Sequence, residues 1–239
     1  MAAVLPPLTV YSARICPWAQ RMTLALREVG AYRNGQVQHV EIDLQNKPDW
    51  YASKVNPASK VPVLQVGKEG DADTLFIPES GVLLELVADL FPESELSPKD
   101  PVKRAYARYF SQRFLDIAAS PINNILLFSQ NEQIPALLTG IEEVQTLLAR
   151  FPGTFLLGEQ ISIGDLAVAP FIGRLFAAGK AGTLSEEAYK PLSTESKYEP
   201  FRAYHKALTS RPSWAETFDE QLVLDLQKRI RQMRAEGKL

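Results

Sequence analysis

The hydrophobic pattern of this chain changes once, and that change limits the fold more than any other feature. Up to about residue 90, short apolar runs rich in β-branched residues alternate with stretches whose apolar residues recur every three or four positions. Beyond the segment 91–101, which holds three prolines among acidic residues and serines, only the helical spacing is found. The pattern predicts two domains: a mixed α/β domain over residues 1–92 and an all-helical domain over residues 93–239.

The first domain opens with a strand and a helix joined by a short loop. Leu8–Ser12 is apolar and β-branched, as a strand requires, and Pro17 suits the first turn of a helix. Apolar residues then recur at helical spacing until Gly30. A second strand over residues 37–44 completes a βαβ unit.

The remainder of this domain predicts a hairpin at the edge of the sheet. A short helix is expected over residues 48–54, then strands over residues 61–66 and 74–77, then a helix capped by Ser80. The short turn between the two strands requires antiparallel pairing. The order β-α-β-α-β-β-α, with a parallel first unit and an antiparallel edge hairpin, is a thioredoxin-like arrangement.

The second domain carries no convincing strand. Helices are expected over residues 102–128, 134–151, 162–178, 200–209 and 213–234. Ser162 and Asp165 form a capping pattern at the start of the most apolar of these helices, since the serine can bond the first turn and the acid favours the helix dipole. We expect this helix to be central and buried.

Composition excludes several functions. A single cysteine excludes an intramolecular disulfide, a dithiol redox motif and a Cys-rich zinc site, and two histidines are too few to replace it, so we expect no metal. The 26 basic and 28 acidic residues give no general attraction to nucleic acid. The apolar run 166–178 is too short to cross a bilayer, and residues 1–10 lack a basic leader region. These features predict a cytoplasmic protein that binds neither nucleic acid nor membrane.

Cys16 is the first candidate for chemistry. It follows a predicted strand and directly precedes the helix that begins at Pro17, where backbone N–H groups and the helix dipole favour the thiolate. Arg14 and Arg21 are near in sequence and add positive potential if they face the thiol. The alternative is that a lone cysteine is a small core residue.

Two further segments suggest a peptide site beside this thiol. Pro62 in a strand-like run suggests a cis Val61–Pro62 bond that presents the backbone of Val61 to an extended peptide; the alternative is a trans proline on an edge strand. Glu79 and Ser80 begin a helix whose N–H donors suit a ligand carboxylate, with Glu79 for an ammonium group; alternatively, Ser80 is only a helix cap. Lys47 offers a charge for a second carboxylate.

Read in order, these segments resemble the glutathione transferases, specifically the omega class. The matching stretches are residues 11–21 (YSARICPWAQR), 46–50 (NKPDW), 56–57 (NP), 60–64 (KVPVL) and 78–80 (PES). The helical second domain, with its capping pattern, is similar as well, so the resemblance covers essentially the whole chain. Trp18 stands where omega proteins often have Phe, and residues 58–60 depart from the usual Phe-Gly-Leu-like stretch.

The resemblance implies an enzyme with glutathione as co-substrate. It implies that Cys16 is the catalytic cysteine, that Val61 pairs with the peptide backbone, that Glu79 and Ser80 hold the γ-glutamyl end, and that Lys47 holds the glycyl carboxylate. Pro17, Trp18 and Pro62 belong to the same expected glutathione site. It also implies a homodimer.

The expected chemistry is thiol transfer with a single cysteine. Such a cysteine suits deglutathionylation of mixed disulfides and glutathionyl ketones, and dehydroascorbate reduction, more than conjugation. A hydrophobic acceptor is expected to bind between the domains, although at helical spacing the core is the likelier place for any one of the residues chosen. The expected lining residues are Trp18, Tyr106, Tyr109, Phe110, Phe114 and Trp214.

Two other functions remain open at this point. One is a ligandin-type binding protein for hydrophobic small molecules such as phenolics, with weak or no turnover. The other is a regulatory interaction protein that keeps the fold without catalysis.

Overall fold

The computed structural model describes residues 5–33 and 35–238, so the first four residues of the N-terminal segment considered above lie outside it. The chain forms two compact units. The first runs to Ser97 and includes the distant segment Glu216–Phe218, and the second holds Pro98–Ala215 and the chain from Asp219 onward. The expected boundary lay after residue 92, but Leu96 is buried, at 2% exposure, and belongs to the first unit. The return of residues 216–218 to the first unit was not predicted.

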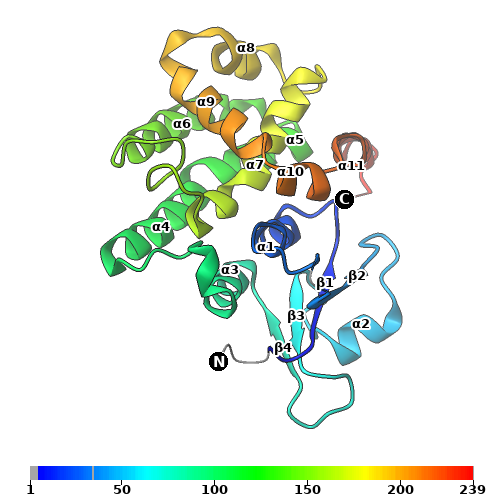
Figure 1. Ribbon diagram of the computed structural model, residues 1–239. Coiled ribbons are helices and arrows are strands. Elements are labelled where there is room, and N and C mark those ends of the chain that lie inside the picture. Colours follow the sequence, from blue (N-terminus) through cyan, green and yellow to red (C-terminus); the bar gives the residue numbers. More distant parts are fainter. Residues whose placement is uncertain (1–4, 34, 239) are drawn as a thin grey trace. The chain divides into compact units, whose positions relative to one another are not determined.

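The first unit is built around a four-stranded sheet with strand order β2-β1-β3-β4. β1 and β2 are parallel, and the other two pairings are antiparallel, which confirms the predicted thioredoxin-like arrangement. Helices α1 and α3 pack against each other (Figure 1). The elements are β1 (Leu8–Ser12), α1 (Pro17–Glu28), β2 (Val37–Glu41), α2 (Asp49–Lys54), β3 (Val63–Val66), β4 (Leu75–Pro78), α3 (Ser80–Leu90) and the short helix η1 (Pro92–Ser94).

Two predicted strand bounds of this unit differ from those in the structure, and a third predicted detail is confirmed. β2 ends at Glu41, three residues earlier than residue 44. β3 begins at Val63, so Pro62 precedes the strand and does not lie within it, because proline has no N–H to donate to a ladder. The Val61–Pro62 peptide is cis, as predicted.

Every named element of the second unit is helical, as predicted. The expected helix over residues 102–128 is two α-helices joined by one π-helical segment, and α8, a polar helix that contains Pro191, was not predicted. Its elements are α4 (Pro101–Phe114), η2 (Leu115–Ala119), α5 (Ser120–Phe128), η3 (Asn131–Gln133), α6 (Ile134–Leu148), α7 (Ile163–Lys180), α8 (Glu186–Thr194), η4 (Ser196–Tyr198), α9 (Glu199–Thr209), α10 (Pro212–Thr217) and α11 (Glu220–Ala235). The last two residues of α10 belong to the first unit.

Helix α7 is the buried centre of the second unit, as predicted: every residue from Ile163 to Gly179 is buried. Its start is held by Asp165, whose carboxylate accepts hydrogen bonds from the N–H of Ser162 (2.8 Å) and of Leu156 (2.9 Å). The hydroxyls of Ser162 and Tyr204 also donate to it, each at 2.7 Å. The predicted capping pattern is therefore confirmed.

No α-helix among the described residues is both long enough and apolar enough to cross a membrane.

Candidate functional site

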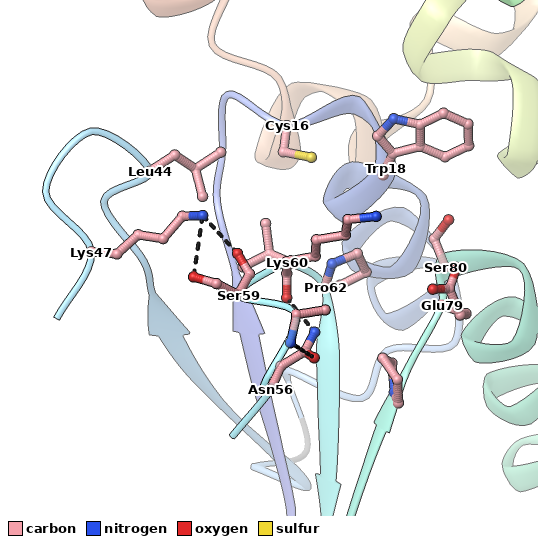
Figure 2. Close-up of a pocket in the computed structure, with 13 residues that line it drawn as sticks. Cys16, Trp18, Leu44, Lys47, Asn56, Ser59, Lys60, Pro62, Glu79 and Ser80 are labelled. Atoms are coloured by element: carbon pink, nitrogen blue, oxygen red, sulfur yellow. Dashed lines mark hydrogen bonds between the residues drawn. The ribbon is translucent and has the colours of Figure 1, made fainter. Parts of the chain in front are cut away.

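A cavity of about 590 Å³ opens in the first unit where four segments meet. Figure 2 shows Lys47 on one side of it, Glu79 and Ser80 on the other, and Cys16 between them at the start of α1. The pocket brings together seven of the eight residues predicted for catalysis and glutathione binding; Pro17, the first residue of α1, is the exception. The lining residues are Cys16, Trp18, Leu44, Lys47, Asn56, Ala58, Ser59, Lys60, Val61, Pro62, Pro78, Glu79 and Ser80.

Cys16 is the N-cap residue of α1. Its backbone is extended (φ −86°, ψ 121°), its N–H donates to the carbonyl of Ala13 at 2.9 Å, and its carbonyl accepts the N–H of Gln20 at 3.0 Å. The side chain is half-buried and does not cap the helix. The thiol therefore sits at the positive end of a 12-residue helix, an environment that favours the thiolate.

The opposite wall is the start of α3, where the sequence-based expectation was off by one residue. Glu79, not Ser80, is the N-cap residue, and Ser80 is the first residue of the helix. Glu79 has a positive φ of 73°, which is uncommon for a residue other than glycine and is found at sites where the backbone is held in a fixed position. Its side chain is exposed at the pocket wall and does not cap α3.

Hydrogen bonds fix the loop that leads to Val61. Asn56, which is buried, donates through Nδ2 to the carbonyl of Lys60 at 2.9 Å, and the hydroxyl of Tyr51 donates to the same carbonyl at 2.9 Å. Lys47 Nζ donates to the carbonyl of Ser59 at 2.6 Å. Among the described residues, no backbone hydrogen bond involves Val61, so its N–H and C=O are available beside the pocket.

Sequence reasoning did not assign the roles of Asn56 and Tyr51. The Asn56-Pro57 pair was a visible signal, because asparagine side chains commonly bond nearby backbone in turns. Tyr51 gave no signal beyond its apolar character, since its hydroxyl partner, Lys60, is set by the tertiary fold.

Arg21 is a buried cation behind the pocket, with only 3% of its surface exposed. Its guanidinium lies over the ring of Trp18, 4.4 Å from the centroid, and Nη1 donates to Ser80 Oγ at 3.3 Å. Burial lowers the pKa of Arg21 to about 10, against an opposite effect of Cys16, so Arg21 stays protonated at neutral pH. Arg14, in contrast, is exposed and does not line this pocket.

Three of the six aromatic residues expected to bind an acceptor are core residues of the second unit. Phe110 and Phe114 have no exposed surface, which contradicts their expected place in a ligand pocket; helical spacing turned them inward. Trp214 is 7% exposed and packs so closely on Gly173 that a Cβ there would overlap its ring. Tyr106 is half-buried and donates to the carbonyl of Leu147 at 2.8 Å. Tyr109 is exposed.

A thioredoxin-like unit whose first helix begins at a pocket-lining cysteine, followed in sequence by an all-helical unit, is the architecture of the glutathione transferases. The sequence matches the family models described as glutathione S-transferase, N-terminal domain, over residues 10–95, and glutathione S-transferase, C-terminal domain, over residues 106–207. The chain belongs to the glutathione S-transferase family, as the resemblance implied.

Within this family, omega-class proteins are among those similar to this chain. The crystal structure of glutathione transferase Omega 2C from Trametes versicolor is 37% identical, covers 94% of this chain and 99% of that one, and superposes with a TM-score of 0.84. The Omega 2S structure from the same organism, in complex with 2,4-dihydroxybenzophenone, is 30% identical, with coverages of 93% and 98% and a TM-score of 0.81.

A curated relative extends the similarity to animals. The protein named "Probable glutathione transferase omega-2" from Caenorhabditis briggsae is 30% identical over 174 residues, which is 70% of this chain. The matched part spans 63% of that relative's length. The family is named for its use of glutathione, and glutathione is the co-substrate expected for this chain.

Proposed function

We propose that this chain is an omega-class glutathione transferase that transfers thiols through the thiolate of Cys16. The observation that carries the proposal is the position of Cys16 at the N-terminus of α1, in one pocket with Val61, Glu79 and Ser80. A helix N-terminus lowers the pKa of a cysteine thiol, and the thiolate is the nucleophile in disulfide exchange.

Each end of glutathione has a chemical match in the pocket. The N–H and C=O of Val61 suit the cysteinyl backbone, which pairs as a short extended segment. The start of α3 suits the γ-glutamyl α-carboxylate, and Glu79 suits its ammonium group. Lys47, across the pocket, suits the glycyl carboxylate.

The proposed reaction has two exchange steps. The Cys16 thiolate attacks the glutathionyl sulfur of a mixed disulfide, so that a bond forms between the two sulfurs and the substrate thiolate leaves. A second glutathione thiolate then attacks the enzyme-bound glutathione, releases oxidised glutathione and restores Cys16. A glutathionyl ketone reacts in the same way, with the enolate leaving and taking up a proton. For dehydroascorbate, two glutathione molecules supply the two electrons and leave as one disulfide.

The test is the Cys16→Ala variant assayed with a glutathionylated peptide and reduced glutathione. The loss of the nucleophile is expected to lower kcat/KM by at least about a thousandfold. The matched control is Thr23→Ala in α1, which changes a residue outside this pocket and is expected to keep wild-type turnover. Unchanged turnover in Cys16→Ala would refute the cysteine mechanism.

A second function, binding of phenolic ligands with weak turnover, is favoured by one observation. The similar Omega 2S protein was crystallised with 2,4-dihydroxybenzophenone, which is an aromatic phenolic ketone. Trp18, 37% exposed at the pocket, and the exposed Tyr109 are the aromatic residues that we retain as ligand candidates. Tight binding of this benzophenone by a protein without thiol transfer activity would favour the binding function over catalysis.

The expected homodimer and cytoplasmic location remain predictions. Size-exclusion chromatography with light scattering would test the first, since a twofold dimer has twice the 26.6 kDa mass of the chain.

A further inference from the structure

Arg21 is a charge held almost entirely out of water directly behind the glutathione pocket. It is 3% exposed, its guanidinium lies over the ring of Trp18, and it donates a hydrogen bond to the hydroxyl of Ser80; both of these residues line the pocket. It projects from α1 toward α3, and these two helices pack together. Taking a cation out of water has a cost in free energy, so its position against two residues of the pocket suggests a role at the pocket.

The hydrogen bond from Arg21 decides how Ser80 can act. A serine hydroxyl has one proton to donate and lone pairs that accept. Because Ser80 Oγ accepts from Arg21 Nη1 at 3.3 Å, its own proton is directed to another acceptor. Ser80 is also the first residue of α3, whose backbone N–H groups add donors at the same point. This corner of the pocket therefore presents donors in front of a positive charge, which suits a carboxylate.

The other charged groups of the pocket suit parts of the ligand other than the α-carboxylate. Glu79 lies next to Ser80 and suits an ammonium group, and Figure 2 shows Lys47 on the far side of the pocket. Lys60 also lines the pocket but belongs to the segment before β3. Arg21, by contrast, donates a hydrogen bond to Ser80 at the start of α3, which places its charge beside this corner.

We propose that Arg21 is a positioning residue that orients the hydroxyl of Ser80 and neutralises the free α-carboxylate of a γ-glutamyl thiol. The pocket thereby selects thiol peptides whose first residue is linked through its side-chain carboxyl, since only these keep an α-carboxylate beside the ammonium group. This inference rests on the proposed glutathione function and names the residue that gives it γ-glutamyl specificity. Burial lowers the pKa of Arg21, and a carboxylate bound nearby acts in the opposite direction because it favours the charged guanidinium.

The experiment measures equilibrium binding by calorimetry with two ligands. The first is S-methylglutathione, which cannot react with Cys16. The second is its analogue in which 4-aminobutyrate replaces the γ-glutamyl residue, so that only the α-carboxylate is missing. The proteins are wild type, Arg21→Met, Arg21→Lys and the control Arg27→Met, which removes an arginine of the same helix that pairs with Glu216 at 3.0 Å, outside this pocket.

The expected result is a loss confined to the ligand with the α-carboxylate. Arg21→Met should bind S-methylglutathione at least tenfold more weakly and the analogue within twofold of wild type. Arg21→Lys should recover part of the loss, and Arg27→Met should bind both ligands like wild type. Analogue binding by Arg21→Met also shows that this variant is folded.

Two results would overturn the proposal while leaving the proposed function intact. They are an equal loss for both ligands in Arg21→Met, which indicates a general structural role, and no loss for either. Failure of the wild-type protein to bind S-methylglutathione would instead overturn the proposed glutathione function and this inference with it.

Discussion

The helices that begin at the pocket and the helix at the centre of the second unit start in opposite ways. At α7, one buried carboxylate, Asp165, accepts four hydrogen bonds and forms a capping box with the N-cap residue Ser162. At α1 and α3, neither N-cap residue, Cys16 or Glu79, caps with its side chain, and both line the pocket. The capped start serves stability, whereas the uncapped starts keep donors and positive potential for a ligand.

The two kinds of helix start also differ in burial. Asp165 has no exposed surface, and burial raises its pKa while the four donors act to lower it. Cys16 is half-buried at an open pocket. The same backbone feature therefore supports the core in one unit and, in our proposal, supports chemistry in the other.

The largest expected effect is on the free energy of unfolding and concerns the buried start of α7. Asp165→Ala leaves the N–H of Leu156, the N–H and hydroxyl of Ser162 and the hydroxyl of Tyr204 without their buried acceptor. Each such loss costs about 1–3 kcal/mol, so we expect the free energy of unfolding to fall by at least about 3 kcal/mol in urea titrations followed by circular dichroism.

The matched control is Asp225→Ala, which removes an exposed carboxylate on α11 that accepts from Gln221. It should change the free energy of unfolding by no more than about 0.5 kcal/mol. Equal effects of the two substitutions would show that the buried cap of α7 has no special weight.

A half-buried histidine of the helical unit predicts a pH effect. His205 stacks on Phe176 with ring centroids 4.0 Å apart, and burial lowers the pKa of His205 from 6.5 to about 4. Between these values the unfolded chain binds a proton that the folded chain does not, so stability decreases as the pH falls from about 6.5 to about 4.

The size of this pH effect follows from the shift in pKa. It corresponds to a loss on the order of 3 kcal/mol across that interval. His205→Leu should lack this part of the pH dependence when urea unfolding is compared at pH 7 and pH 4.5. Parallel pH profiles for the variant and the wild type would contradict the assignment to His205.

On the pocket side, Lys47→Met should weaken the binding of S-methylglutathione by about five- to tenfold, because one charge-assisted contact to a carboxylate is lost. Lys54→Met, an exposed lysine of the same unit outside the pocket, serves as the control and should bind as the wild type does. Calorimetry measures both. Wild-type affinity in Lys47→Met would remove Lys47 from the proposed glycyl subsite.

The smallest expected effect concerns the start of α1, where a side-chain cap can replace the thiol. Cys16 already has the extended backbone of an N-cap, so Cys16→Ser adds a side-chain acceptor for the first turn of α1. We expect this variant to gain about 0.5–1 kcal/mol in free energy of unfolding while losing thiol transfer. If the free energy of unfolding of Cys16→Ser is no higher than that of Cys16→Ala, α1 gains nothing from a side-chain cap.

Local patterns predicted most of the fold. The strand Leu8–Ser12, the helix starting at Pro17 and the capping pair of Ser162 and Asp165 were predicted because each depends on residues within a few positions of one another. The cis peptide before Pro62 was predicted for the same reason.

Features that depend on distant parts of the chain were not predicted. The sequence did not indicate that residues 216–218 join the first unit, or that Arg21 would reach Ser80, 59 positions away. Phe110 and Phe114 were assigned to a pocket because helical spacing alone does not tell which face of α4 meets the core.

The central claim is that Cys16 forms a disulfide with glutathione in the pocket. Its most direct test is mass spectrometry of the intact protein, followed by peptide mapping, after incubation with oxidised glutathione. The account predicts one glutathione adduct per chain, located on Cys16 and removed by reduced glutathione. An unmodified chain under conditions that glutathionylate a small-molecule thiol would contradict it.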